Sequence, residues 1–305
     1  MKAFSSEISR LVGRRSIRRI VALMILACVA FGGYLFLKSQ SLPAPIAAKV
    51  DRDLRDLERF KGPVIRVCVR GSDGAAPKPP ETRERCEREW IELQADKDRT
   101  RFHFARNWTF LVNASVGLLI LGWLVGATFV GADWTTRFIA TRLMWEPRRT
   151  RLFVGSVLAI GVATFAATVL LQLLFVFASL PAALLRGSFQ GVSPFWVGST
   201  AATILRGGLV ASSGSVMALA LGTVSRGTAG ALGAGLLFFF LQGPLSTVGS
   251  FTPYLMFEGV SAFVGTSLGL GSQLTTLQGG LQIGAYPLAV AVLGWYTFRF
   301  RDIAL

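Results

Sequence analysis

The stretch LFVGSVLAIGVATFAATVLLQLLFVFASL, residues 152–180, contains no charged side chain. A helix needs about 20 residues to cross the hydrocarbon core of a bilayer, so this stretch is long enough for one crossing. Water could not solvate such a run as part of a globular surface. The stretch therefore predicts a membrane-spanning helix, which Pro181 is expected to end.

Five more apolar runs meet the same criterion in a chain that is 52% hydrophobic and 16% charged. The run from Gly207 to Phe257 is too long for one crossing, and its one charged residue, Arg226, marks an expected turn. The first run could instead be a cleaved signal peptide, but its apolar core exceeds the roughly 7 to 15 residues of such peptides. The fold class is thus an all-α membrane protein with six transmembrane helices. The expected spans are residues 20–37, 108–132, 152–180, 209–224, 229–246 and 281–298.

Short basic segments predict the orientation. Residues 1–19 hold six basic side chains against one acidic, and residues 133–151 hold five against two. By the positive-inside rule both segments are cytoplasmic, and six crossings place the turn 225–228 and the tail 299–305 on the same side. N- and C-termini are therefore expected in the cytoplasm. The remaining connections, of which the last is apolar enough to be re-entrant, are then outside: residues 38–107, 181–208 and 247–280.

The net charge of +15 does not require a nucleic-acid partner. The arginines cluster beside apolar runs rather than along one face of a soluble fold. Such juxtamembrane arginines fix topology and contact anionic membrane lipid. Membrane lipid is therefore an expected partner, and nucleic acid is not.

The connection at residues 38–107 is expected to form a small extracytoplasmic loop domain. Cys68 and Cys86 both lie in it, and an oxidising compartment would let them form a disulfide, whereas Cys28 lies in the first apolar run. Helical patterns at residues 50–60 and 81–98 flank a Gly/Pro-rich linker at residues 71–80. One disulfide would stabilise this helical domain by about 3 kcal/mol.

The sequence offers no catalytic machinery. It has no G-x-x-x-x-G-K-[ST] motif, so a nucleotide would have to be bound by another polypeptide. The predicted spans hold no His, Asp, Glu or Lys, and the single His103 has no Cys/His partner pattern. We therefore expect a non-enzymatic membrane subunit without a metal or cofactor of its own. Small residues four apart, such as Ala211 and Ser215, would let spans approach each other closely.

The segment GATFVGADWTTRFIATRLMWEPRRTRLFVG, residues 126–155, is the most informative for function. A helix is expected to leave the membrane at Gly131 and to present three aromatic side chains, those of Trp134, Phe138 and Trp145, on one side until Pro147 stops it. Apolar residues on its other side favour packing against a protein over lying on lipid. An ordinary basic cytoplasmic loop is the alternative.

This segment closely resembles the cytoplasmic signature of actinobacterial ABC-2-type transporter permeases, through GADW at residues 131–134 and WEPRR at residues 145–149. The turn SRGTAG, the ending YTFRFRDIAL and the cysteine-bearing first outer loop are similar too. The resemblance implies a permease subunit in the plasma membrane of a bacterium, which pairs with a second permease subunit as a homo- or heterodimer. Because the family mostly exports, it also implies an exporter. It also implies a separate ABC-type ATPase subunit that binds ATP and Mg. Where the family commonly has Glu, this chain has Asp133.

The resemblance further implies that residues 133–149 dock the ATPase, with Glu146, Arg148 and Arg149 as polar contacts and Trp134 and Trp145 as apolar anchors. A polytopic membrane sensor or scaffold with a ligand-binding outer loop remains the alternative. The transported substrate is not indicated by any motif. The candidate coupling residues are Asp133, Trp134, Arg137, Phe138, Arg142, Trp145, Glu146, Pro147, Arg148 and Arg149.

Overall fold

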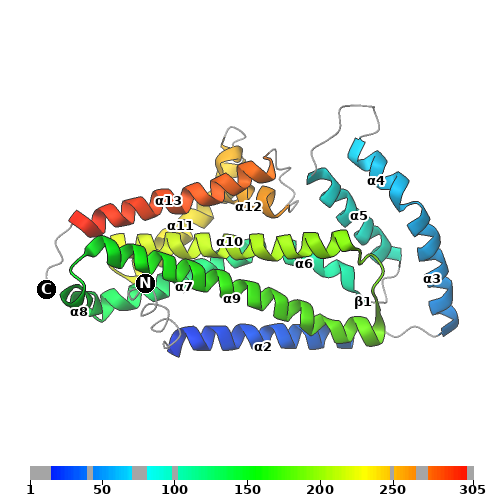
Figure 1. Ribbon diagram of the computed structural model, residues 1–305, viewed down its shortest axis with the longest axis horizontal. Helices are drawn as coiled ribbons and strands as arrows, with labels where there is room; N and C mark the ends of the chain where they lie inside the picture. Colours follow the sequence, from blue (N-terminus) through cyan, green and yellow to red (C-terminus); the bar gives the residue numbers. More distant parts are fainter. Residues whose placement is uncertain are drawn as a thin grey trace. The chain divides into compact units, whose positions relative to one another are not determined.

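The computed structural model describes residues 15–39, 44–70, 81–97, 102–247, 251–265 and 274–300, and almost all of them are helical (Figure 1). The two strands, β1 (Phe102–His103) and β2 (Gly187–Ser188), form one short parallel pair. Two single 3₁₀ turns are η1 (Phe104–Arg106) and η2 (Thr252–Tyr254). The α-helices are α2 (Arg15–Lys38), α3 (Ala44–Arg59), α4 (Lys61–Arg70), α5 (Glu81–Lys97), α6 (Asn107–Asn113), α7 (Ser115–Thr135), α8 (Phe138–Trp145), α9 (Arg149–Arg186), α10 (Pro194–Ser225), α11 (Thr228–Ser246), α12 (Met256–Val264) and α13 (Thr276–Phe300).

Six of the described helices are long and apolar enough to cross a membrane. They are α2, α7, α9, α10, α11 and α13. The number of apolar helices predicted from the sequence is therefore confirmed, as is the break at Arg226 between α10 and α11. Arg226 has a positive φ of 57°, which lets the chain reverse within two residues.

The helices around the third span are longer than predicted. Helix α9 has 38 residues and continues through Pro181 to Arg186, so the prediction that this proline ends the helix is wrong. Helix α10 already begins at Pro194, so much of the predicted outer loop at residues 181–208 is helical. Proline removes one backbone N–H, but apolar membrane helices tolerate it because neighbouring groups satisfy the freed carbonyl. The second predicted span also differs, since the helix is interrupted at Ala114 between α6 and α7.

The described residues fall into two compact units. The first unit is drawn from Met1–Ala22, Ala114–Leu170 and Leu205–Leu305. The second is drawn from Leu23–Asn113 and Leu171–Ile204. The candidate coupling residues all belong to the first unit, and both disulfide cysteines belong to the second.

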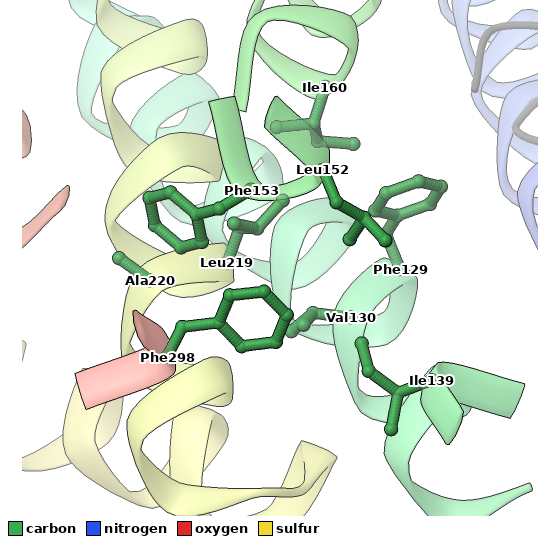
Figure 2. Packing of buried hydrophobic residues seen from close by; sticks show 9 residues of the cluster. All are labelled: Phe129, Val130, Ile139, Leu152, Phe153, Ile160, Leu219, Ala220 and Phe298. Carbon is green, nitrogen blue, oxygen red and sulfur yellow. The ribbon is translucent and has the colours of Figure 1, made fainter. Parts of the chain in front are cut away.

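The core of the first unit joins five helices, α7 to α10 and α13. Figure 2 shows Phe298 of α13 reaching toward Val130 of α7 and Leu219 of α10. Helices α7 and α10 cross closely, because a Cβ added to Gly126 would meet the backbone carbonyl of Ser215. The small-residue spacing in the sequence thus corresponds to a close helix crossing. The whole buried cluster is Phe129, Val130, Ile139, Leu152, Phe153, Ile160, Leu219, Ala220 and Phe298.

Helix α12 packs along α13 in the same unit. The close contact is made by glycine, since a Cβ on Gly279 would meet the backbone oxygen of Gly259. A helix is therefore present where the sequence predicts a re-entrant or interfacial one. Glu258 in α12 is 1% exposed, and its Oε1 has no hydrogen-bond partner among the described residues.

The second unit contains the predicted disulfide, which joins Cys68 of α4 to Cys86 of α5. Lys61 and Glu87 add an ion pair between the same two helices, with Nζ and Oε2 3.0 Å apart. The helices predicted on either side of the cysteines correspond to α3 and α5. The predicted linker at residues 71–80 lies outside the described residues.

Candidate functional site

The candidate coupling segment contains a sharp break between α7 and α8. The backbone N–H of Thr136 still bonds the Ala132 carbonyl at 3.1 Å, but Arg137 then adopts a left-handed conformation with φ 55° and ψ 14°. A non-glycine residue in this region ends a helix, because continuing the right-handed spiral would require a negative φ. Helix α8 starts immediately afterwards and contacts α7.

This break corrects the prediction of one continuous aromatic face. Trp134 lies in the last turn of α7, whereas Phe138 and Trp145 lie at the two ends of α8. Residues seven apart lie on the same side of a helix, so Phe138 and Trp145 share one side of α8, about two turns apart. Trp134 is therefore separate from them.

A buried ion pair connects the two helices across the break. Arg142 Nη1 of α8 donates to Asp133 Oδ2 of α7 at 3.2 Å, and the Asp133 side chain is 3% exposed. Arg142 Nη2 also lies 3.5 Å from the Ser156 hydroxyl of α9. Burial lowers the pKa of Arg142 to about 10, so the guanidinium is still charged at neutral pH. The two residues hold α8 against α7 and α9, a role that differs from the predicted contact with a partner ATPase.

Trp134 is covered by the turn between α10 and α11. The Arg226 guanidinium lies over its ring, 5.9 Å from the centroid. Beside it, Gly131 packs so closely on Thr228 that a Cβ would meet the threonine hydroxyl. Trp134 is half-buried and contacts this turn, while its role as an apolar anchor for a partner stays a prediction.

The start of α9 is bound to the end of α13. Arg149 Nη1 lies 3.5 Å from the Phe298 carbonyl and 3.4 Å from the Arg299 carbonyl. The indole N–H of Trp295 donates to the Thr150 hydroxyl at 3.2 Å. A cation on the last carbonyls of a helix stabilises its C-terminus. Arg149, predicted as a partner contact, thus binds α13.

Helix α8 ends where Pro147 begins the link to α9. Glu146 has extended backbone angles, as expected for a residue that precedes proline. Its carboxylate pairs loosely with Arg151, with Oε2 and Nη1 3.8 Å apart and both side chains partly exposed. Both residues are accessible enough to change partners.

The outward side of this segment is apolar and basic. Phe138 is 42% exposed, Met144 73% and Trp145 88%. Arg137 and Arg148 are exposed beside them. We refer to these five residues as the α8 face. Met144 was not predicted, because its position in the sequence shows nothing that separates it from the buried Ile139 or the half-buried Leu143 of the same helix.

The residue types of the α8 face are those of a binding surface. Among the described residues no group of three His, Cys, Asp or Glu side chains is placed to hold a metal ion. Aromatic residues, Met and Arg are the residue types enriched in protein interfaces, and Trp and Arg often contribute most of the binding energy. The arrangement therefore suits docking of another protein.

Comparison with known proteins assigns no family. No family model, curated protein or solved structure matches this chain.

Proposed function

We propose that this chain is the membrane-spanning permease subunit of an ABC-2-type ATP-driven transporter. The signature of residues 131–134 and 145–149 supports this proposal. The single observation that supports it best is the α8 face, with Trp145 88% exposed at the end of an internally fixed helix. An exposed Trp on a segment that also exposes Phe, Met and Arg side chains suits a pocket on a partner protein.

In this proposal α8 transmits movement between an ATPase and the spans. The Asp133–Arg142 pair and the Ser156 contact attach α8 to both α7 and α9. A partner that moves α8 therefore moves two helices long enough to span the membrane. ATP and Mg are bound by the partner, so this subunit changes conformation without catalysing hydrolysis.

The topology proposed with this function places α8 and both termini in the cytoplasm of a bacterium, in its plasma membrane. The disulfide-linked helices α4 and α5 then lie outside, in a compartment where a disulfide is stable. A second permease subunit, identical or homologous, completes the transporter. Export is the proposed direction, by resemblance to the family.

Co-purification tests this proposal. The tagged full-length chain is expressed with the P-loop ATPases encoded near its gene and purified in mild detergent. We expect a stoichiometric ATPase, and we expect the double variant Trp145→Ala/Arg148→Ala to lose it. Arg149 is left intact, because its replacement would also disturb α13 and a loss of binding would be ambiguous.

A matched control uses the second unit. Arg59 and Phe60 are also an exposed basic–aromatic pair, with the Arg59 side chain 81% and Phe60 63% exposed. The double variant Arg59→Ala/Phe60→Ala should retain the ATPase. If both double variants lose the ATPase, or if neither does, docking through the α8 face is contradicted.

A membrane sensor is the second candidate, and a cavity in the second unit favours it. This cavity, of about 750 Å³, is lined by charged residues of α3, α4 and α5, including Lys61, Arg66 and Glu87. A ligand-binding outer domain would use such a cavity. A purified chain that binds no ATPase, but is stabilised by an extracellular small molecule only when Arg66 is intact, would favour the sensor.

A further inference from the structure

A cavity of about 340 Å³ is lined by residues of the second unit. Its wall is formed by the end of α2, by β1, η1 and α6, and by one residue of α9. Its apolar part includes Leu35 and four phenylalanines, three of which stack in a row. The Phe31 and Phe110 ring centroids are 5.2 Å apart, and those of Phe110 and Phe175 are 4.6 Å apart. The volume falls within the range of small-molecule sites.

The other part of the wall is basic. Lys38 and Arg106 both line the cavity, and none of the described lining residues is Asp or Glu. Arg106 makes no ion pair within the described ranges, and the one described contact of the Lys38 ammonium is the Tyr34 ring, 5.8 Å from its centroid. Two cations beside which the described part of the chain places no carboxylate produce a positive potential that attracts an anion.

Both cations are carried by firmly held backbone. Arg186 Nη1 donates to the Phe36 carbonyl at 3.1 Å and lies 3.4 Å from the Ser39 carbonyl, which fixes the end of α2. On the other side, Asn107 Nδ2 donates to the Ser179 hydroxyl at 2.5 Å, immediately after Arg106. Such anchoring lowers the entropy cost of binding a ligand between the two positions.

We infer that this cavity binds the phosphate ester of an anionic amphiphile, with the phosphate at Lys38 and Arg106 and the hydrocarbon chain on the phenylalanines. Lys and Arg form charge-assisted hydrogen bonds to phosphate, and the Tyr34 hydroxyl on the same wall can add a donor. Tyr34 and Phe110 are 52% and 44% exposed, so a chain could continue outward along an apolar surface. The inference is independent of the proposed transport function.

Two sources share this chemistry, an anionic membrane lipid and a free phosphate. The structure favours the lipid, because a free phosphate would leave the aromatic wall without a ligand group. The occupant is therefore assigned as an anionic phospholipid.

The test is a titration of the full-length protein in non-ionic detergent, followed by native mass spectrometry. The probes are dioctanoyl phosphatidylglycerol, dioctanoyl phosphatidylcholine and inorganic phosphate. We expect one phosphatidylglycerol per chain, bound about ten-fold more tightly than phosphatidylcholine, a difference of about 1.4 kcal/mol. Lys38→Gln/Arg106→Gln should weaken phosphatidylglycerol binding at least about ten-fold, and Lys38→Arg/Arg106→Lys should restore most of it.

The control variant Arg55→Gln/Arg59→Gln removes two exposed cations of the same unit outside the cavity and should change the dissociation constant less than about two-fold. Phe110→Ala should weaken the binding of phosphatidylglycerol but not the binding of inorganic phosphate. Equal binding of both lipids, or an unchanged constant in the Lys38/Arg106 variant, would overturn the inference. Displacement of the lipid by inorganic phosphate at similar concentration, with no effect of Phe110→Ala, would overturn the lipid assignment in favour of free phosphate.

Discussion

Replacing Arg142 by Met tests the buried link between α7 and α8. Methionine has a similar length and a high helix propensity, so α8 should keep its backbone. The change removes the donor that lies 3.2 Å from Asp133, whose side chain is only 3% exposed. The carboxylate then stays buried without the Arg142 guanidinium, or takes up a proton, and both outcomes disfavour the folded state.

The size of the effect follows from this burial. Removing one partner of a buried ion pair costs about 3–5 kcal/mol. The Arg142 side chain is 13% exposed, so some solvent can enter, and we expect the lower end of that range. A loss of about 3 kcal/mol raises the unfolding equilibrium constant on the order of a hundred-fold.

Reversible unfolding of the full-length chain in mixed detergent micelles, followed by circular dichroism, measures this change. The double variant Asp133→Asn/Arg142→Met removes both charges. Its free energy of unfolding should be about 2 kcal/mol higher than that of Arg142→Met alone. An Arg142→Met variant within about 0.5 kcal/mol of wild type would refute the buried pair. A double variant no more stable than the single one would refute it equally.

Three further changes test other parts of the fold. Gly126→Ala should lower the free energy of unfolding by about 1–3 kcal/mol, because the added methyl group meets the α10 backbone. Gly117→Ala in the same helix places its methyl group in open space, so it should leave stability unchanged or raise it. Thermal unfolding of the two variants measures the difference. Cys68→Ser/Cys86→Ser removes the disulfide and should lower the stability of the region around α4 and α5 by about 3 kcal/mol. Amide hydrogen exchange should become faster in α4 and α5 and stay unchanged in α7. Burial raises the pKa of Glu258 above its ordinary 4.5, so the folded state holds its proton more tightly than the unfolded state. The free energy of unfolding should therefore fall as pH rises from about 4.5 through the folded-state pKa, and Glu258→Gln should remove that fall in a pH series of unfolding curves.

The sequence predicts the helices well, because apolar run length is a local property. The break at Arg226 could also be predicted, since one arginine divides a run too long for a single crossing. The disulfide followed from two cysteines in one hydrophilic loop, at Cys68 and Cys86. In each case the signal lies within a short stretch of chain.

Tertiary contacts explain what could not be predicted. The segment of residues 133–149 has the composition of a docking helix, but no local pattern shows that Asp133 and Arg142 bind each other, or that Arg149 binds the end of α13. Nor does the sequence show that Arg137 adopts a positive φ and separates Trp134 from the exposed aromatic residues. The helix continues through Pro181 for a related reason, since neighbours rather than the proline itself decide whether its freed carbonyl is satisfied.

Site-specific photo-crosslinking from the α8 face tests the central claim most directly. A photoreactive phenylalanine replaces Trp145, whose 88% exposure means that the change removes no buried packing, and the control carries the same group in place of Phe60. The account predicts an adduct between the Trp145 position and a P-loop ATPase in membranes, and none from the Phe60 position. A Trp145 position that crosslinks only to lipid, or to other proteins without an ATPase among them, would contradict the proposed role of this chain.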